Sequence, residues 1–192
     1  MGLEEKLASL RKASDEIRDR KLGTAHFIAL SKAVGDKWLE RKGEIAERLS
    51  KDANYSKAMA YIWVEPTAQI FYGAEQIYGL LGKNGARYLD EWHQGEGDSC
   101  KRHAEPLGVV GVVGVQNAFP ANIMYMWNVL SVPGNTVLFK PASGDDVTVH
   151  VIKELIEDVI KNADKDSMLH NSPYVNAIES EYWKGGEDIE KE

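Results

Sequence analysis

The chain has 192 residues and a formal net charge of −7, from 23 Lys plus Arg against 30 Asp plus Glu. This length permits a buried core without cross-links, and the acidic balance argues against a nucleic-acid partner, which usually faces a basic stripe. The N-terminus lacks the apolar centre of a signal peptide, and no apolar run reaches the roughly 18 residues that suggest a membrane span. Cys100 is the only cysteine, which excludes an intramolecular disulfide and a zinc site built from several cysteines. We therefore expect a cytoplasmic protein without a nucleic-acid or membrane partner.

Residues 1–82 predict a layer of amphipathic helices. Apolar residues at helical spacing indicate helices over 3–20, 26–34 and 36–49, separated near glycines. The more aromatic stretch up to residue 82 predicts one long or broken helix, in which Pro66 should kink the chain or start a second half. Because such helices need a partner surface, we expect this layer to pack on another part of the fold.

Residues 83–104 are polar and rich in turn residues, and their pattern leaves open whether they form a hairpin of two short strands or a linker. The run PLGVVGVVGV that follows Glu105 predicts a strand buried on both faces of a parallel sheet. A helix-compatible stretch leads to TVLFK, a second buried strand. After it, Ser143 is a candidate cap, with Asp146 three residues on, for the most amphipathic helix of the chain.

The order strand, helix, strand, helix over residues 105–161 predicts a Rossmann-like unit, half of a doubly wound parallel sheet. Residues 162–192 are polar and acidic, and we expect them to form an irregular tail. The five histidines show no HxxxH or HExxH spacing, so we expect no metal site.

Two motifs in this half of the chain carry a family resemblance. EPLGVVG followed by Asn117, and then GNTVLFKPAS, resemble the aldehyde dehydrogenase superfamily, and the interval from Asn117 to Gly134 agrees with the family without a gap. The resemblance is clear over residues 102–160 and continues, with a weaker match, back to about residue 25. It implies a truncated aldehyde dehydrogenase-like fold of class α/β, with a helical layer and half of a Rossmann-like sheet.

The resemblance gives Asn117 the role of an oxyanion donor, whose amide would hydrogen-bond the oxygen of the thiohemiacetal formed from an aldehyde. QNAFP departs from the family pattern, since Ala118 stands where the family has phenylalanine and Phe119-Pro120 follow one position later. The alternative for Asn117 is an ordinary turn asparagine.

The resemblance also implies NAD or NADP as the cofactor. Val115 and Gln116 would lie against it, and the Lys140 ammonium would contact the adenosine ribose or its 2′-phosphate. Ser143 stands where NAD-preferring members often carry glutamate, so the repulsion of a 2′-phosphate would be absent. The alternative for Lys140 is a lysine in solvent at the end of a strand, and the alternative for Ser143 is a helix cap. The small residues of the preceding strand would then serve only sheet packing.

The family's cysteine nucleophile and glutamate base have no counterpart in this sequence, because Cys100 precedes the first strand and does not match the nucleophile. We therefore expect an N-terminal fragment that is inactive alone, binds the cofactor weakly or not at all, and works on an aldehyde only with a complementing chain. A homo-oligomer is possible. The second hypothesis is a non-catalytic interaction or assembly module derived from the same fold, because a half-sheet exposes an edge and an apolar face.

Overall fold

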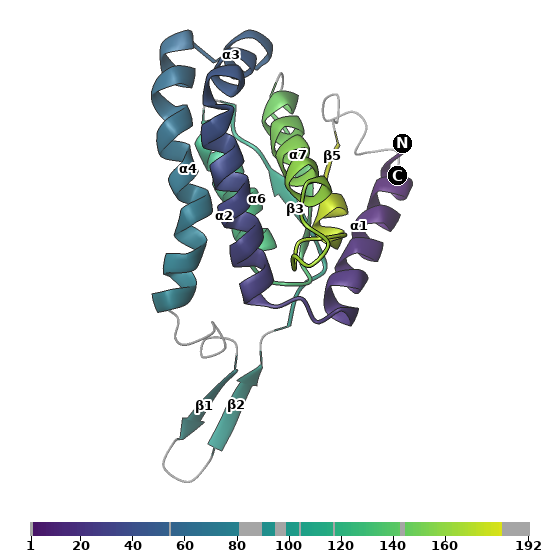
Figure 1. The fold of residues 1–192 in the computed structure, drawn as a ribbon. Helices are drawn as coiled ribbons and strands as arrows, with labels where there is room; N and C mark the ends of the chain where they lie inside the picture. The colour runs from purple at the N-terminus through teal and green to yellow at the C-terminus, as the bar shows by residue number, and fades with distance from the viewer. Residues whose placement is uncertain are drawn as a thin grey trace.

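The computed structural model describes residues 2–53, 55–80, 90–94, 99–103, 105–116, 118–142 and 145–181 (Figure 1). Its elements are, in chain order, α1 (Leu3–Asp19), α2 (Thr24–Glu40), α3 (Lys42–Asp52), α4 (Lys57–Leu80), β1 (Asp90–Gln94), β2 (Ser99–His103), β3 (Val109–Val113), α6 (Phe119–Leu130), β4 (Thr136–Lys140), α7 (Asp146–Lys161), the 3-10 helix η1 (Pro173–Asn176) and β5 (Ile178–Ser180). None of the helices in this part of the chain is long and apolar enough to cross a membrane.

Helix α2 continues through Gly35, where the sequence predicted a break between two helices. A Cβ atom at Gly35 would lie 3.1 Å from the Cβ of Phe71 and 3.2 Å from the ring of Tyr72. The glycine therefore permits α2 to approach α4 closely and does not end the helix. The break falls instead at Arg41, between α2 and α3.

Helix α4 is continuous across Pro66, which settles the choice between a long and a broken helix in favour of one helix. The proline ring removes one backbone donor from the helix interior. Next to it, the Thr67 hydroxyl donates a hydrogen bond of 2.6 Å to the carbonyl oxygen of Trp63, one turn earlier in the same helix.

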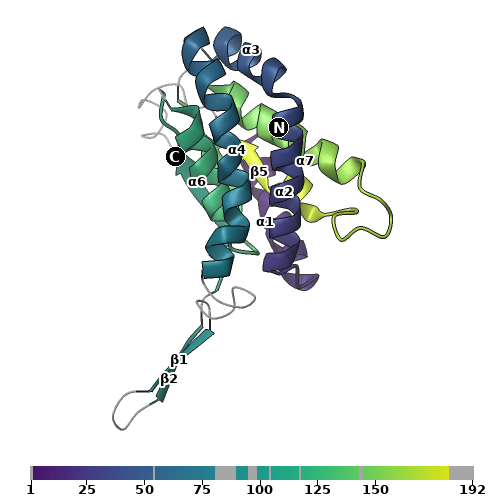
Figure 2. The same cartoon turned by 60° about the vertical axis from the view of Figure 1, so that its left-hand side comes forward.

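Strands β3, β4 and β5 form a parallel sheet in that order, with Val113 opposite Lys140 and Val137 opposite Ile178. Helices α6 and α7 contact both the sheet and the α2–α4 layer, while α1 contacts all three strands. Figure 2 shows α2, α4 and α6 beside one another. The expected combination of a helical layer with half of a Rossmann-like parallel sheet is confirmed.

The third strand corrects the sequence prediction that everything after residue 161 is irregular. Ile178 is 1 % exposed and Tyr174 in η1 is also 1 % exposed, so this segment belongs to the core. The Lys6 ammonium donates to the Ser180 carbonyl at 2.7 Å and thereby joins α1 to the strand. A strand of three residues is too short to show a period of its own, which is why the pattern missed it. Residues 182–192 lie outside the described part of the chain.

Strands β1 and β2 pair antiparallel, with Asp90 opposite His103 and Gln94 opposite Ser99. For these residues the structure decides between the two alternatives for the 83–104 segment in favour of a hairpin. The hairpin extends away from the helices and the parallel sheet (Figures 1 and 2). Residues 83–89 and 95–98 lie outside the described residues.

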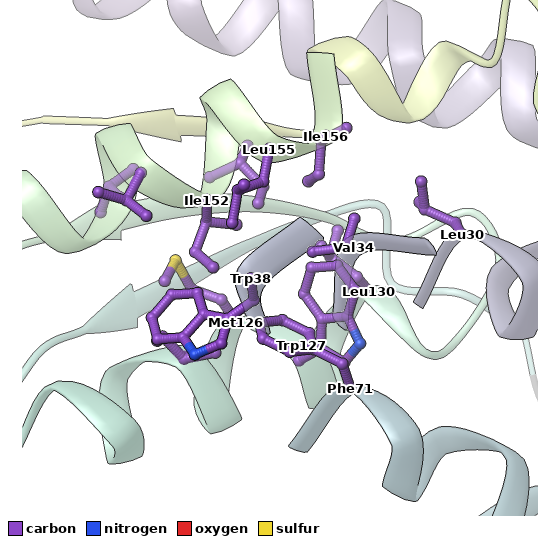
Figure 3. Packing of buried hydrophobic residues seen from close by; sticks show 14 of the residues in the cluster. Leu30, Val34, Trp38, Phe71, Met126, Trp127, Leu130, Ile152, Leu155 and Ile156 are labelled. Atoms are coloured by element: carbon purple, nitrogen blue, oxygen red, sulfur yellow. The ribbon is translucent and has the colours of Figure 1, made fainter. Parts of the chain in front are cut away.

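The core lies between the α2–α4 layer and helices α6 and α7 (Figure 3). Phe71 on α4 packs against two tryptophans of this core, with its ring 4.8 Å from Trp127 and 5.6 Å from Trp38, measured between centroids. From the sheet side, α7 contributes Ile152 and Leu155, both fully buried. The helical layer and the Rossmann-like unit therefore share one continuous apolar core.

Candidate functional site

The carboxyl ends of β3 and β4 meet at one edge of the sheet. The Gly114 amide, just after β3, donates to the Lys140 carbonyl at 2.8 Å, so the chain leaves both strands side by side. Val115 is 37 % exposed, Gln116 is exposed and Lys140 is half-buried. In open parallel sheets, ligands bind beyond this edge. Three of the five site residues expected from the sequence are thus brought together.

The other two expected site residues, Asn117 and Ser143, lie outside the described residues, and their roles stay predictions. Cys100 lies on β2 in the hairpin, and its side chain is likewise outside the description.

Gly114 is required by close packing at this edge. A Cβ atom there would lie 2.5 Å from the Phe139 ring of β4 and 3.2 Å from Oδ1 of Asn122, whereas a Cβ at Gly111 would meet nothing within 4 Å. Close packing of β3 against β4 therefore accounts for a glycine at position 114.

Asn122 on α6 holds the backbone of Val115. The Val115 amide donates to Oδ1 of Asn122 at 2.8 Å, and Nδ2 of Asn122 donates to the Val115 carbonyl at 2.9 Å. The Asn122 side chain is completely buried. One side chain therefore satisfies both backbone polar groups of the residue that begins the exposed turn.

Asp145 is the next member of the same buried network. Its Oδ2 accepts hydrogen bonds from Nδ2 of Asn122 at 2.7 Å and from the Tyr55 hydroxyl at 3.0 Å, and its Oδ1 accepts from the Thr148 hydroxyl at 2.6 Å. Asp145 is only 1 % exposed. It immediately precedes the first residue of α7, where the helix dipole favours a negative charge.

The position of Asp145 corrects the expected start of the last long helix. The sequence predicted Ser143 as the cap, but the helix begins at Asp146, with Asp145 in the preceding position. The Asp145 carboxylate accepts from the Thr148 hydroxyl in the first turn of the helix. No local pattern indicates that Asp145 meets Asn122 and Tyr55, because these residues are far apart in the chain.

Burial perturbs the ionisation of this network. Burial raises the pKa of the Asp145 carboxyl, and the hydrogen bonds from Thr148, Tyr55 and Asn122 act in the opposite direction. Burial and the adjacent Asp145 raise the pKa of the Tyr55 hydroxyl well above its usual range, so Tyr55 stays a donor at neutral pH. A buried carboxyl with a shifted pKa beside an open sheet edge is a recognised mark of a functional site, although structural networks show it too.

Two other polar features lie away from this edge. A hollow of about 410 Å³ is lined by Arg11, Arg18 and residues 107–109, at the amino end of β3. Nε2 of His26 lies 2.7 Å from the Ser172 hydroxyl, and the ring of His26 stacks on Tyr174 in the core. Across the described ranges, no group of three or more His, Cys, Asp or Glu side chains could hold a metal ion.

The arrangement of helices and strands in this chain also occurs in solved structures of other proteins. No family model and no curated protein matches the sequence. Among solved structures, a glyceraldehyde-3-phosphate dehydrogenase of Methanocaldococcus jannaschii, solved with NADP, superposes with a TM-score of 0.71 at 17% identity over 95% of this chain and 36% of its own. A NAD-dependent benzaldehyde dehydrogenase of Corynebacterium glutamicum gives a TM-score of 0.70 at 20% identity, over 94% of this chain and 35% of its own.

A NAD-dependent aldehyde dehydrogenase of Sinorhizobium meliloti matches with a TM-score of 0.71 at 21% identity, over 95% of this chain and 33% of its own. The chain has an aldehyde dehydrogenase-like fold. It spans about a third of the length of these solved dehydrogenases, consistent with their N-terminal part. The resemblance expected from the two sequence motifs is thus confirmed at the level of the fold.

Proposed function

We propose that the chain binds NAD or NADP at the carboxyl edge of β3 and β4, as the cofactor-binding part of an enzyme that oxidises an aldehyde to an acid or thioester. The observation that carries the proposal is the parallel β3–β4 pair, which brings Val115, Gln116 and Lys140 to one open edge within an aldehyde dehydrogenase-like fold. Both cofactors occur among the structural neighbours, since one was solved with NADP and others are described as NAD-dependent.

The residues of the edge fit such a cofactor. In the proposal, the Lys140 ammonium contacts the adenosine ribose or its 2′-phosphate, and Val115 and Gln116 lie against the cofactor where the chain leaves β3. Ser143 adds no negative charge that would repel a 2′-phosphate, so NADP is tolerated. The bound cofactor would supply the hydride acceptor of the oxidation.

Asn117 is the proposed oxyanion donor. Its amide would donate to the oxygen that becomes negative when a nucleophile attacks the aldehyde, an interaction worth several kcal/mol in a site without water. The cysteine nucleophile and the glutamate base would be supplied by the rest of a complete dehydrogenase, on the same chain or on a complementing one. We also propose that the chain can assemble with copies of itself as a homo-oligomer.

Titration of the chain with NADH and NADPH, followed by nucleotide fluorescence, tests the proposal. Lys140→Met should weaken NADPH binding by about ten-fold or more, because a hydrogen bond to a charged group contributes roughly 1.5–3 kcal/mol. Lys161→Met is the matched control, since Lys161 lies at the far end of α7 and pairs with Glu157. Equal affinity in both variants would remove Lys140 from the site, and no binding of either nucleotide at millimolar concentration would favour the interaction module instead.

A further inference from the structure

We propose that Asn122 and Asp145 are positioning residues that hold the backbone of Val115, the residue that begins the exposed turn, in the conformation needed for cofactor binding. This inference rests on the proposed function and adds residues that the sequence did not indicate. Neither side chain is accessible to a ligand, because Asn122 is completely buried and Asp145 is 1 % exposed. They can act on a bound cofactor only through the backbone that they hold.

The first step is the pair of hydrogen bonds between Asn122 and Val115. Val115 lies beyond the last residue pair of the β3–β4 ladder, so neither of its backbone groups has a partner in that ladder. The Asn122 amide replaces the ladder for both groups, at 2.8 Å and 2.9 Å. It extends the ordered backbone of β3 to the start of the exposed turn.

The second step is the orientation of the Asn122 amide. An ionised carboxylate only accepts hydrogen bonds, so Asp145 requires the NH₂ group of Asn122 to face it. Oδ1 of Asn122 must then face the Val115 amide. A flipped amide would bring Oδ1 of Asn122 against Oδ2 of Asp145 and its NH₂ group against the Val115 amide. Asp145 therefore selects the one orientation that satisfies Val115.

The third step is the support of Asp145 itself. The Thr148 hydroxyl from α7 and the Tyr55 hydroxyl from the segment before α4 fix its two oxygens. Tyr55 also packs edge-on against Phe119, the first residue of α6, with ring centroids 5.2 Å apart. The conformation at the end of β3 is thus set by groups from the helical layer, α6 and α7 together.

Three variants of the whole chain test the inference by amide hydrogen exchange and nucleotide affinity. Asn122→Leu removes both bonds to Val115. Asp145→Asn removes none of them directly but supplies an NH₂ group, so it permits the Asn122 amide to flip. Ser31→Ala is the control, since Ser31 is a fully buried hydroxyl that bonds Phe71 of α4 and Trp127 of α6, neither of which lies at the sheet edge.

Exchange rates at Val115 are normalised to the Val137 amide of β4, which donates to Ala177 within the sheet and reports global opening. We expect Val115 to exchange about ten-fold faster or more in Asn122→Leu and measurably faster in Asp145→Asn, with nucleotide affinity falling in the same order. Ser31→Ala should change neither quantity after normalisation.

The inference is overturned if Val115 exchange in Asp145→Asn equals that in Ser31→Ala, or if exchange rises in both edge variants while nucleotide affinity stays at the wild-type value. Failure of the proposed function gives a different result: the wild-type chain then binds neither NADH nor NADPH. In that case, faster exchange in Asn122→Leu and Asp145→Asn still shows that these side chains order the Val115 backbone. The claim that they position a cofactor is then refuted together with the proposed function.

Discussion

Two buried polar clusters of this chain differ in what they hold in place. In the helical layer, the Ser31 hydroxyl donates to the Phe71 carbonyl at 2.7 Å and accepts from Nε1 of Trp127 at 2.5 Å. At the carboxyl edge of the sheet, Asp145 and Asn122 connect Tyr55 and Thr148 to the backbone of Val115. The first cluster joins core elements to one another, and the second leads to an exposed segment.

The chemistry of the clusters differs as well. Ser31 and its partners are neutral, so their burial costs only the desolvation of groups that then find hydrogen bonds. Asp145 is an ionisable group in the interior, and a whole network of this kind can often be replaced by well-packed apolar residues without loss of stability, although removal of one member alone is costly. Its presence at the sheet edge is therefore better explained by the segment that it orders than by stability alone.

The largest effect is expected in the helical core. Trp127 is 2 % exposed and contacts both Phe71 and Phe27, so Trp127→Ala should lower the free energy of unfolding by about 3–5 kcal/mol. Trp63→Ala is the control, because Trp63 is 47% exposed on α4 and its loss should cost about 0.5 kcal/mol or less. Urea titrations measure both values. Similar losses in the two variants would show that Trp127 contributes no more to the shared core than an exposed tryptophan does.

Removal of the buried carboxylate comes next. Asp145→Ala leaves the donors on Asn122, Thr148 and Tyr55 without their acceptor, and we expect a loss of about 3 kcal/mol. Asp146→Ala changes an exposed neighbour in the first turn of α7 and should cost at most about 1 kcal/mol through the helix dipole. Equal losses in urea titrations would mean that Asp145 acts only as a helix-end charge.

Two glycines in and just after β3 test how closely this strand approaches β4. Gly114→Ala should destabilise the fold by about 1–3 kcal/mol, because the new Cβ would overlap the Phe139 ring and press on Asn122. Gly111→Ala meets open space, and there the loss of unfolded-chain entropy should leave stability unchanged or raise it by up to about 1 kcal/mol. Thermal unfolding compares the two, and a tolerated Gly114→Ala would contradict the described approach of β3 to β4.

The smallest effect concerns pH. Burial, reinforced by Arg20, lowers the pKa of His26 below 6.5. The unfolded chain therefore takes up a proton that the folded chain resists, and the free energy of unfolding falls as pH drops through about 6.5 toward the lower folded value. His26→Gln should lose this part of the pH dependence between about pH 7.5 and 5.5. An unchanged dependence in urea titrations at the two pH values would assign it to other groups.

The sequence predicted the regular parts of the molecule because their patterns are local. The valine run of β3, TVLFK of β4 and the apolar face of α7 each form the predicted element where the pattern placed it. The prediction that β3 is buried on both faces is wrong, because β3 lies at the end of the described parallel sheet and Val113 is 67% exposed. Gly35 misled the prediction because its role is a contact with α4, a distant segment. Strand β5 was missed because three residues gain their identity only from pairing with β4.

For the candidate site, the family motifs indicated the residues at the carboxyl edge of β3 and β4. They did not indicate Asn122 and Asp145, which hold the backbone there. Val115, Gln116 and Lys140 lie within or beside those motifs, so the resemblance indicated them. Asn122 and Asp145 lie on different elements and meet only in the folded chain. No local pattern encodes that contact, and its polarity alone did not distinguish either residue from an ordinary helix or cap position.

A backbone NMR titration of the labelled chain with NADP and with NAD locates the nucleotide on the fold. We expect the amide signals of Val115, Gln116 and Lys140 to shift with nucleotide concentration, while those of Ile178 in β5 and of Val109 at the amino end of β3 stay in place. Shifts that centre on Arg11 and Arg18 at the opposite end of β3, or the absence of any shift at millimolar nucleotide, would contradict a cofactor site at the carboxyl edge.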